Sequence, residues 1–273
     1  MENFPEIKEK KKFRFPFLGI YSILIYLFLY IPLIVVVLFS FSGNRSTVSF
    51  SSVTFKWYLE LFQNSELVSS LVHSIQVSLS AVIIAVIIGT SGAFFIVRVN
   101  FPGKRFFITL AQLPIILPGI IVGIAMLIFF INVRSPLSIL TITLGHISFT
   151  TPVVMFQVTS RLQRLGKTYE DAAKDLGANP FKTLFLVTIP MIKTAIIGSA
   201  MLAFAMSFDE IIITYFLTGS WTTLPVFIYG MMRFGLSPQV YAISTVILLF
   251  SLIIIFFMAR LTGTRAEELE IKK

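Results

Sequence analysis

Long stretches without charged residues alternate with short polar segments along the chain. After an uncharged stretch at residues 15–44, four more cover 67–97, 106–133, 135–160 and 234–259. Each is longer than the ~20 residues that a helix needs to cross the hydrocarbon core of a bilayer. A further apolar stretch between Lys193 and Arg233 is interrupted by two acids, Asp209 and Glu210. The pattern predicts six transmembrane helices, the first at about 17–41. That first stretch is too long, and too bulky at its end, for a cleaved signal peptide.

Prolines and small residues indicate how these helices bend and pack. Pro114 and Pro118 each remove a backbone hydrogen bond, so the third helix is expected to be bent or broken. Small side chains let a neighbouring helix approach closely. They gather at Gly89, Ser91, Gly92 and Ala93, and again at Gly119 and Gly123.

Composition agrees with a chain whose solvent is lipid. Of the 273 residues, 56% are hydrophobic and 13% charged, against roughly 45–50% and ~25% in soluble domains. We therefore expect an all-α integral membrane protein, with one transmembrane domain over 1–273 and no room for a soluble catalytic domain. Cysteine is absent, and the two histidines, His73 and His146, lie far apart. No metal site and no catalytic residue are predicted, and each histidine is expected at a helix interface or in a loop.

Basic residues orient the helices. If the N-terminus is placed inside the cell, 18 of the 22 Lys and Arg residues fall on inner segments. Cytoplasmic segments of membrane proteins carry such an excess. Both termini are therefore predicted to be cytoplasmic, together with a basic N-terminus at 1–16, a polar loop at about 161–193 and a tail at 260–273. The net charge of +9 is explained by topology and by contact with membrane lipid, and it requires no nucleic-acid partner.

An outer loop is expected at about 42–66. It contains Phe55, Lys56, Trp57 and Tyr58. Trp and Tyr favour the membrane–water interface, so this stretch predicts a short helix on the outer surface.

The polar stretch Thr168–Pro190 predicts two short helices with a sharp break. Thr168 and Asp171 have the spacing of a capping box, and Gly177 stands where a residue with positive φ ends a helix. Asn179 can cap a second helix, with Pro180 in its first turn. Apolar residues recur at helical spacing in both halves: Tyr169, Ala172, Ala173 and Leu176, then Phe181, Leu184 and Phe185. Periodicity alone is also compatible with an ordinary helical hairpin.

This stretch resembles the "EAA" loop of ABC-transporter permeases, which docks into the ATPase subunit. The family pattern is Glu-Ala-Ala, three residues, Gly, nine residues, Ile, any residue, Leu-Pro. Here it stands as Asp171-Ala172-Ala173, Gly177, Val187, Ile189 and Pro190, with three conservative departures at intact spacing. The resemblance implies a type I ABC importer permease fold and an ATPase-coupling loop made by Glu170, Asp171, Ala172, Ala173, Gly177, Pro180 and Pro190.

Two adjacent acids, Asp209 and Glu210, lie inside an apolar stretch. With a fifth helix starting near Lys193, Asp209 is expected in the outer half of the membrane. Intramembrane carboxylates usually face a polar cavity and mark a substrate path. Two alternatives stay open: one acid pairs with a basic residue of a partner subunit, or the helix ends before Asp209 and both acids are in water.

The sequence around these acids is similar to the second permease subunit of spermidine/putrescine-type importers. The likeness lies in Ser207-Phe208-Asp209-Glu210, Thr214, Gly219, Thr223-Leu224-Pro225, Ile228-Tyr229, Arg233, Gly235 and Ser237-Pro238. It implies a substrate path for a polycation formed by Asp209, Glu210, Phe208, Tyr215, Trp221 and Tyr229, through charge pairing and cation–π contact. It further implies a location in the bacterial inner membrane and four kinds of partner: a second homologous permease, two cytoplasmic ATPases, an extracytoplasmic substrate-binding protein and lipid.

No nucleotide-binding loop is present. The nearest string, Gly103-Lys104-Arg105, lacks the upstream Gly and the Ser/Thr of a P-loop. No cofactor is therefore expected in this chain, and ATP and Mg would be bound by the partner ATPase. Two alternatives remain: a permease of the same build for iron, a sugar phosphate or an amino acid derivative, and a secondary transporter or channel working alone.

Overall fold

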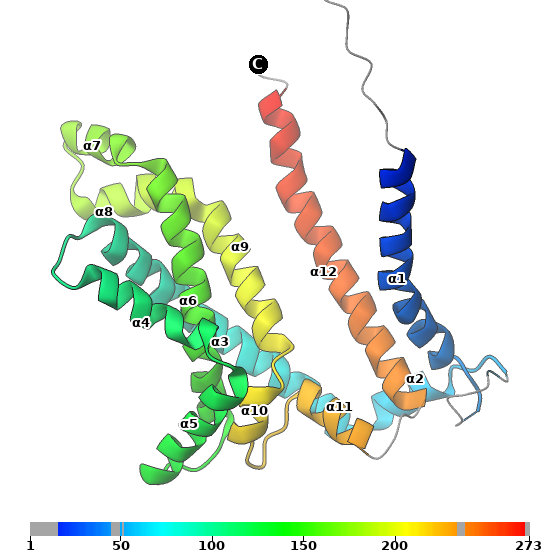
Figure 1. Ribbon diagram of the computed structural model, residues 1–273. Helices are drawn as coiled ribbons and strands as arrows, with labels where there is room; N and C mark the ends of the chain where they lie inside the picture. Colours follow the sequence, from blue (N-terminus) through cyan, green and yellow to red (C-terminus); the bar gives the residue numbers. More distant parts are fainter. Residues whose placement is uncertain (1–15, 45–49, 51, 234–237, 271–273) are drawn as a thin grey trace, which may run out of the picture. The chain divides into compact units, whose positions relative to one another are not determined.

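The computed structural model describes residues 16–44, 50, 52–233 and 238–270. The basic N-terminus predicted at 1–16 lies outside this range except for Pro16, as do Gly235 and Ser237. The chain divides into two compact units, one of Met1–Leu61 with Leu236–Lys273 and one of Phe62–Gly235. Helices dominate the described residues of both units (Figure 1).

The first unit contains α1 (Pro16–Ser40), most of α2 (Lys56–Gln63) and α12 (Pro238–Glu270). α1 is apolar on all sides and packs against α12, where Phe39 lies 6.0 Å from the ring of Tyr241. None of the apolar window of α1 is buried. A helix that is hydrophobic all round and exposed in its own chain is suited to lipid or to a partner subunit.

α2 confirms the short helix predicted in the first loop. Its Trp57 is nonetheless buried, and the indole N–H donates to the carbonyl oxygen of Ser42 at 2.7 Å. The hydroxyls of Ser40 and Tyr58 are 2.6 Å apart. These bonds fix α2 to the end of α1 within the unit.

The second unit holds the remaining helices. In chain order they are α3 (Ser65–Arg98), α4 (Lys104–Ile116), α5 (Gly119–Asn132), α6 (Ile139–Leu165), α7 (Thr168–Asp175), α8 (Pro180–Thr183), the π-helical turn η1 (Leu184–Thr188), α9 (Ile189–Phe208), α10 (Ile212–Leu217) and α11 (Leu224–Arg233).

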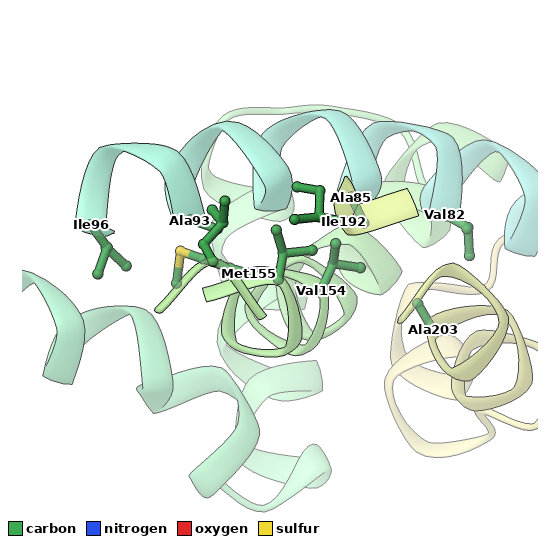
Figure 2. Close-up of a cluster of buried hydrophobic side chains, with 10 residues drawn as sticks. Val82, Ala85, Ala93, Ile96, Val154, Met155, Ile192 and Ala203 are labelled. Atoms are coloured by element: carbon green, nitrogen blue, oxygen red, sulfur yellow. The ribbon is translucent and has the colours of Figure 1, made fainter. Parts of the chain in front are cut away.

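The core of this unit lies where α3, α6 and α9 meet (Figure 2). Val82, Ala85, Val154 and Ile192 are buried there. A Cβ on Gly89 would lie 2.9 Å from the carbonyl oxygen of Thr151 and from Val154, so only glycine permits this approach of α3 to α6.

The other small residues do not all share this role. Gly92 and Ala93 meet α6 as expected, and a Cβ on Gly123 would lie 2.8 Å from the ring of Phe216 in α10. Ser91 instead is exposed, and at Gly119 there is ordinary room for a Cβ, 3.7 Å from Ile212. The prediction of close packing was wrong at these two positions.

The third predicted span is broken, as its prolines indicated. α4 and α5 meet at an angle of 101°. Leu117 and Pro118 between them are extended, with ψ of 138° and 134°. Proline restricts the residue before it to extended conformations and has no N–H for the helix ladder, so the break falls at Pro118. Pro114 lies inside α4 without ending it.

Four described helices are long and apolar enough to cross a membrane, or five if α4 and α5 form one span. They are the segments Gly19–Ser40, Ser65–Arg98, Ile139–Leu165 and Pro180–Phe208. In α12, the described side chains give a shorter apolar stretch, Pro238–Ile253. The sixth span and the sidedness of both termini stay predictions.

Candidate coupling segment and translocation site

The Thr168–Pro190 segment breaks where the sequence predicted. Gly177 follows α7 with φ of +83°, a left-handed conformation that favours glycine. The Asn179 side chain accepts from the N–H of Lys182 at 2.8 Å, and Pro180 occupies the first turn of α8. Local capping chemistry therefore shapes this turn.

Two expectations for the segment were wrong. Thr168 is the first helical residue and not a cap, because the N–H of Asp171 donates to the carbonyl oxygen of Lys167 at 2.9 Å. The second helix is not short, since α8, η1 and α9 form one helical run over Pro180–Phe208.

Pro190 explains the π turn in that run. It lacks an N–H, and its ring would crowd the carbonyl four residues earlier in a regular helix. The turn widens instead, and the N–H of Ile189 donates to the carbonyl oxygen of Leu184. Such π turns inside helices are frequent at functional sites.

Apolar side chains of the segment point into solvent. Leu176 is 90% exposed and Phe181 74% exposed. Tyr169, Phe185 and Leu186 are also exposed, as are Asp171 and Ala172, whereas Ala173 is half-buried. Several large apolar side chains exposed on one short polar segment are typical of a protein contact.

Glu170 points the other way, into the unit. Its Oε1 accepts from Nη2 of Arg98 at 2.8 Å and from the hydroxyl of Thr188 at 3.2 Å. The two ion-pair side chains are only 17% and 12% exposed. Nη2 of Arg98 also donates to the carbonyl oxygen of Gly166 at 2.6 Å. Glu170 is thus an anchor of the segment.

The two acids lie at a helix end, not inside a span. α9 stops at Phe208, and Asp209 and Glu210 lie between α9 and α10. This corrects the placement of Asp209 within the fifth helix. Asp209 is exposed, whereas Oε1 of Glu210 accepts from the N–H of Ile213 at 2.8 Å. Glu210 therefore satisfies an N–H in the first turn of α10, and among the described residues Asp209 has no such partner.

His146 holds this break in place from α6. It is 1% exposed, with Nδ1 2.7 Å from the hydroxyl of Ser207 and Nε2 2.8 Å from that of Thr214. The hydroxyl of Thr214 also donates to the carbonyl oxygen of Glu210 at 3.2 Å. Nε2 must then donate to Thr214, and Nδ1 accepts from Ser207. One neutral imidazole joins α6, the end of α9 and α10, as expected of a histidine at a helix interface.

The four predicted aromatic residues do not surround one cavity. Tyr215 and Tyr229 meet edge to face at 6.2 Å and line a cavity of about 460 Å³ with Glu66 and Arg233 on its walls. The ring of Trp221 lies 4.3 Å from that of His73 at a tilt of 48°, and Phe208 stacks on Phe204 at 5.8 Å. Neither Asp209 nor Glu210 lines the tyrosine cavity.

The loop that carries Trp221 is fixed to α3. Nδ1–H of His73 donates to the carbonyl oxygen of Thr222 at 3.0 Å, and the Ser74 hydroxyl accepts from the N–H of Leu224 at 2.7 Å. These pairs are about 150 residues apart in the sequence. Arg98, Thr188, His146 and Ser74 were not assigned to a site from the sequence, because no local signal names partners so distant.

Comparison with known proteins decides the family. A family model described as "binding-protein-dependent transport system inner membrane component" matches residues 81–265, more than half of the chain. The chain belongs to this permease family. The matched region contains Arg98, His146, the Thr168–Pro190 segment and the Asp209–Glu210 pair. This confirms the resemblance to ABC permeases and sets aside a transporter that works alone.

Relatives match over nearly the whole length of this permease. The putrescine transport system permease protein PotI of Escherichia coli K12 is 32% identical over 280 residues, covering all of this chain and 97% of PotI. The spermidine/putrescine permease PotC of the same strain is 32% identical, covering 87% and 90%. PotC of Haemophilus influenzae is 29% identical over 91% and 97% of the two chains.

A solved structure has the same fold. A chain from the crystal structure of a bacterial ABC transporter that imports the acidic polysaccharide alginate superposes with a TM-score of 0.68 at 16% identity. The superposition covers 93% of the permease and 98% of that chain. The permease is therefore a multi-pass inner membrane component of an ABC importer. It is non-catalytic and works with an ATPase and a binding protein.

Proposed function

We propose that this permease carries polyamines such as putrescine and spermidine, as the second of two permease subunits. The observation that carries the proposal is the 32% identity to the putrescine permease PotI over all of this chain. Two permeases for spermidine and putrescine, from different bacteria, match at a similar level.

The exposed carboxylate of Asp209 suits a cationic substrate. It follows the C-terminus of α9, where the helix dipole places about half a negative charge. Broken helix ends of this kind coordinate cations in other transporters. An ammonium group of a polyamine would lose water at such a site, and the fixed charge of Asp209 offsets that cost.

We propose the assembly that goes with this substrate. The permease pairs with a second homologous permease in the inner membrane, and both chain termini lie in the cytoplasm. Two ATPases bind ATP and Mg and dock on the Thr168–Pro190 segment, while a binding protein delivers the polyamine from outside. Closure of the ATPase dimer moves the segment, and the helices open the path that includes Asp209.

Substrate-stimulated ATP hydrolysis by the complete transporter in lipid nanodiscs tests the proposal. With binding protein present, putrescine or spermidine is expected to raise the hydrolysis rate, whereas ferric ion, a sugar phosphate and an alginate oligosaccharide leave it at the basal level. Uptake of the same solutes into proteoliposomes is measured in parallel. Stimulation by a member of the second group, without a response to polyamines, would overturn the substrate assignment but leave the family membership intact.

A further inference from the structure

A three-element contact joins α7 to the rest of the second unit. Arg98 is the last residue of α3, and its Nε and Nη2 both donate to Oε1 of Glu170 in α7, at 3.2 and 2.8 Å. The hydroxyl of Thr188 in η1 donates to the same oxygen at 3.2 Å. A single carboxylate oxygen therefore receives hydrogen bonds from two other elements.

α7 has little else to hold it. None of its residues is buried. It lies between two glycines with positive φ, Gly166 at +69° and Gly177 at +83°. No heavy atom lies within 4 Å of a Cβ built at either glycine, and a pocket of about 180 Å³ opens beside Glu170 and α8. Without the contact to Arg98, a force on α7 would be absorbed by rotation at these glycines.

α3, in contrast, is held along much of its length. Its residues Val82, Ala85, Ala93 and Ile96 pack in the core with α6 and α9 (Figure 2). A force that reaches the end of α3 is therefore passed to the transmembrane helices, because close-packed interiors transmit displacement.

We propose that Arg98, Glu170 and Thr188 form a latch that couples the Thr168–Pro190 segment to α3, with Arg98 as a positioning residue for ATP-driven transport. The latch rests on the proposed docking of the ATPase at this segment. If the latch is broken, the ATPase is expected to dock and to hydrolyse ATP, but less substrate is expected to cross the membrane for each ATP hydrolysed.

The test uses the complete transporter in proteoliposomes and measures polyamine taken up per ATP hydrolysed. Arg98→Glu and Glu170→Arg are each expected to lower this ratio about tenfold, as for residues in direct contact. The double variant R98E/E170R restores the ion pair and is expected to recover most of the ratio. Thr188→Val, which removes the third donor, is expected to give a smaller loss.

Lys104→Gln is the matched control. Lys104 lies six residues after Arg98 and donates to the carbonyl oxygen of Val99, without touching Glu170. Its loss removes an equal charge close to the latch and is expected to leave the ratio unchanged. Arg98→Lys is used if the transporter with Arg98→Glu does not assemble. It keeps the positive charge but lacks the Nε donor, so it is expected to lower the ratio of polyamine to ATP only in part.

Docking is followed separately, by cross-linking a single cysteine at Phe181→Cys to the ATPase. A cross-link of equal yield in all latch variants, with a lowered ratio that the double variant restores, supports the latch. An unchanged ratio in Arg98→Glu, or no recovery in the double variant, overturns it while docking stands. Absence of the cross-link in the chain with an intact latch would instead overturn the proposed docking itself.

Discussion

The carboxylate of Glu210 accepts a hydrogen bond from the N–H of Ile213, which holds it at the start of α10. Asp209, one residue earlier, is exposed at the end of α9. Replacing Asp209 with Asn is therefore expected to lower polyamine uptake about tenfold, the effect of losing one charged partner. Glu210→Gln retains an oxygen for Ile213 and should have a smaller effect. Initial uptake rates in proteoliposomes measure both, and an equal response of the two variants would contradict this division of roles.

Replacing His146 is expected to lower the stability of the folded chain. His146→Phe keeps a ring at this position but removes the imidazole nitrogens that bond the buried hydroxyls of Ser207 and Thr214. Ser207 loses its partner, whereas Thr214 keeps the carbonyl oxygen of Glu210, so the expected cost is about 1–3 kcal/mol for the one unsatisfied group. The melting temperature of the purified chain in detergent should fall. Ser148→Ala on the same helix is the control, since within the described part of the chain the Ser148 hydroxyl bonds only to the carbonyl oxygen of Gly145. A melting temperature unchanged by His146→Phe would show that the contact contributes nothing.

At the scale of residues, the sequence predicted those features that depend on neighbours within one turn of the chain. Asn179 and Gly177 act within one turn of chain, and the sequence identified both. The prediction that Thr168 caps the helix was wrong by one residue, because neighbouring cap positions look alike in sequence. In the structure the N–H of Asp171 donates to the carbonyl oxygen of Lys167. Arg98 and Glu170 lie 72 residues apart, so only the folded chain pairs them.

Among the elements, the turn at Gly177 separates α7 from α8. Because nothing lies within 4 Å of a Cβ there, Gly177→Val has room but is forced into a left-handed backbone, which costs about 1–2 kcal/mol. We expect the chain to insert normally, the ATPase to copurify poorly and transport to be lost. Gly177→Asn is the control, because Asn tolerates this conformation. Normal transport by Gly177→Val in a normally assembled complex would show that the turn is not part of coupling.

Among the helices, the positions of the ends were the least predictable feature. The break at Pro118 was expected, since proline acts on its immediate neighbours. The second helix was wrongly expected to be short, because its sequence does not show that a π turn keeps the helical run continuous through Pro190. The end of α9 before Asp209 has no glycine or proline to mark it, and His146 fixes it from another helix.

For the molecule as a whole, the distribution of basic residues predicts sidedness, and the absence of cysteine makes this simple to test. Single variants Leu176→Cys and Ser220→Cys both place a thiol at an exposed position. In intact cells, a membrane-impermeant maleimide should label Ser220→Cys and should reach Leu176→Cys only after permeabilisation. Labelling of Leu176→Cys in intact cells would invert the proposed orientation.

The 101° bend between α4 and α5 has a consequence for how the chain is made. The insertion machinery selects segments by apolar length, and the uncharged run at 106–133 is long enough to be accepted as one straight helix. In the folded chain α5 packs against α10, where Gly123 receives the ring of Phe216. α10 is synthesised only after α6 and α9. The final orientation of α5 is therefore expected to form late in biogenesis, after α10 has been synthesised and can pack against it.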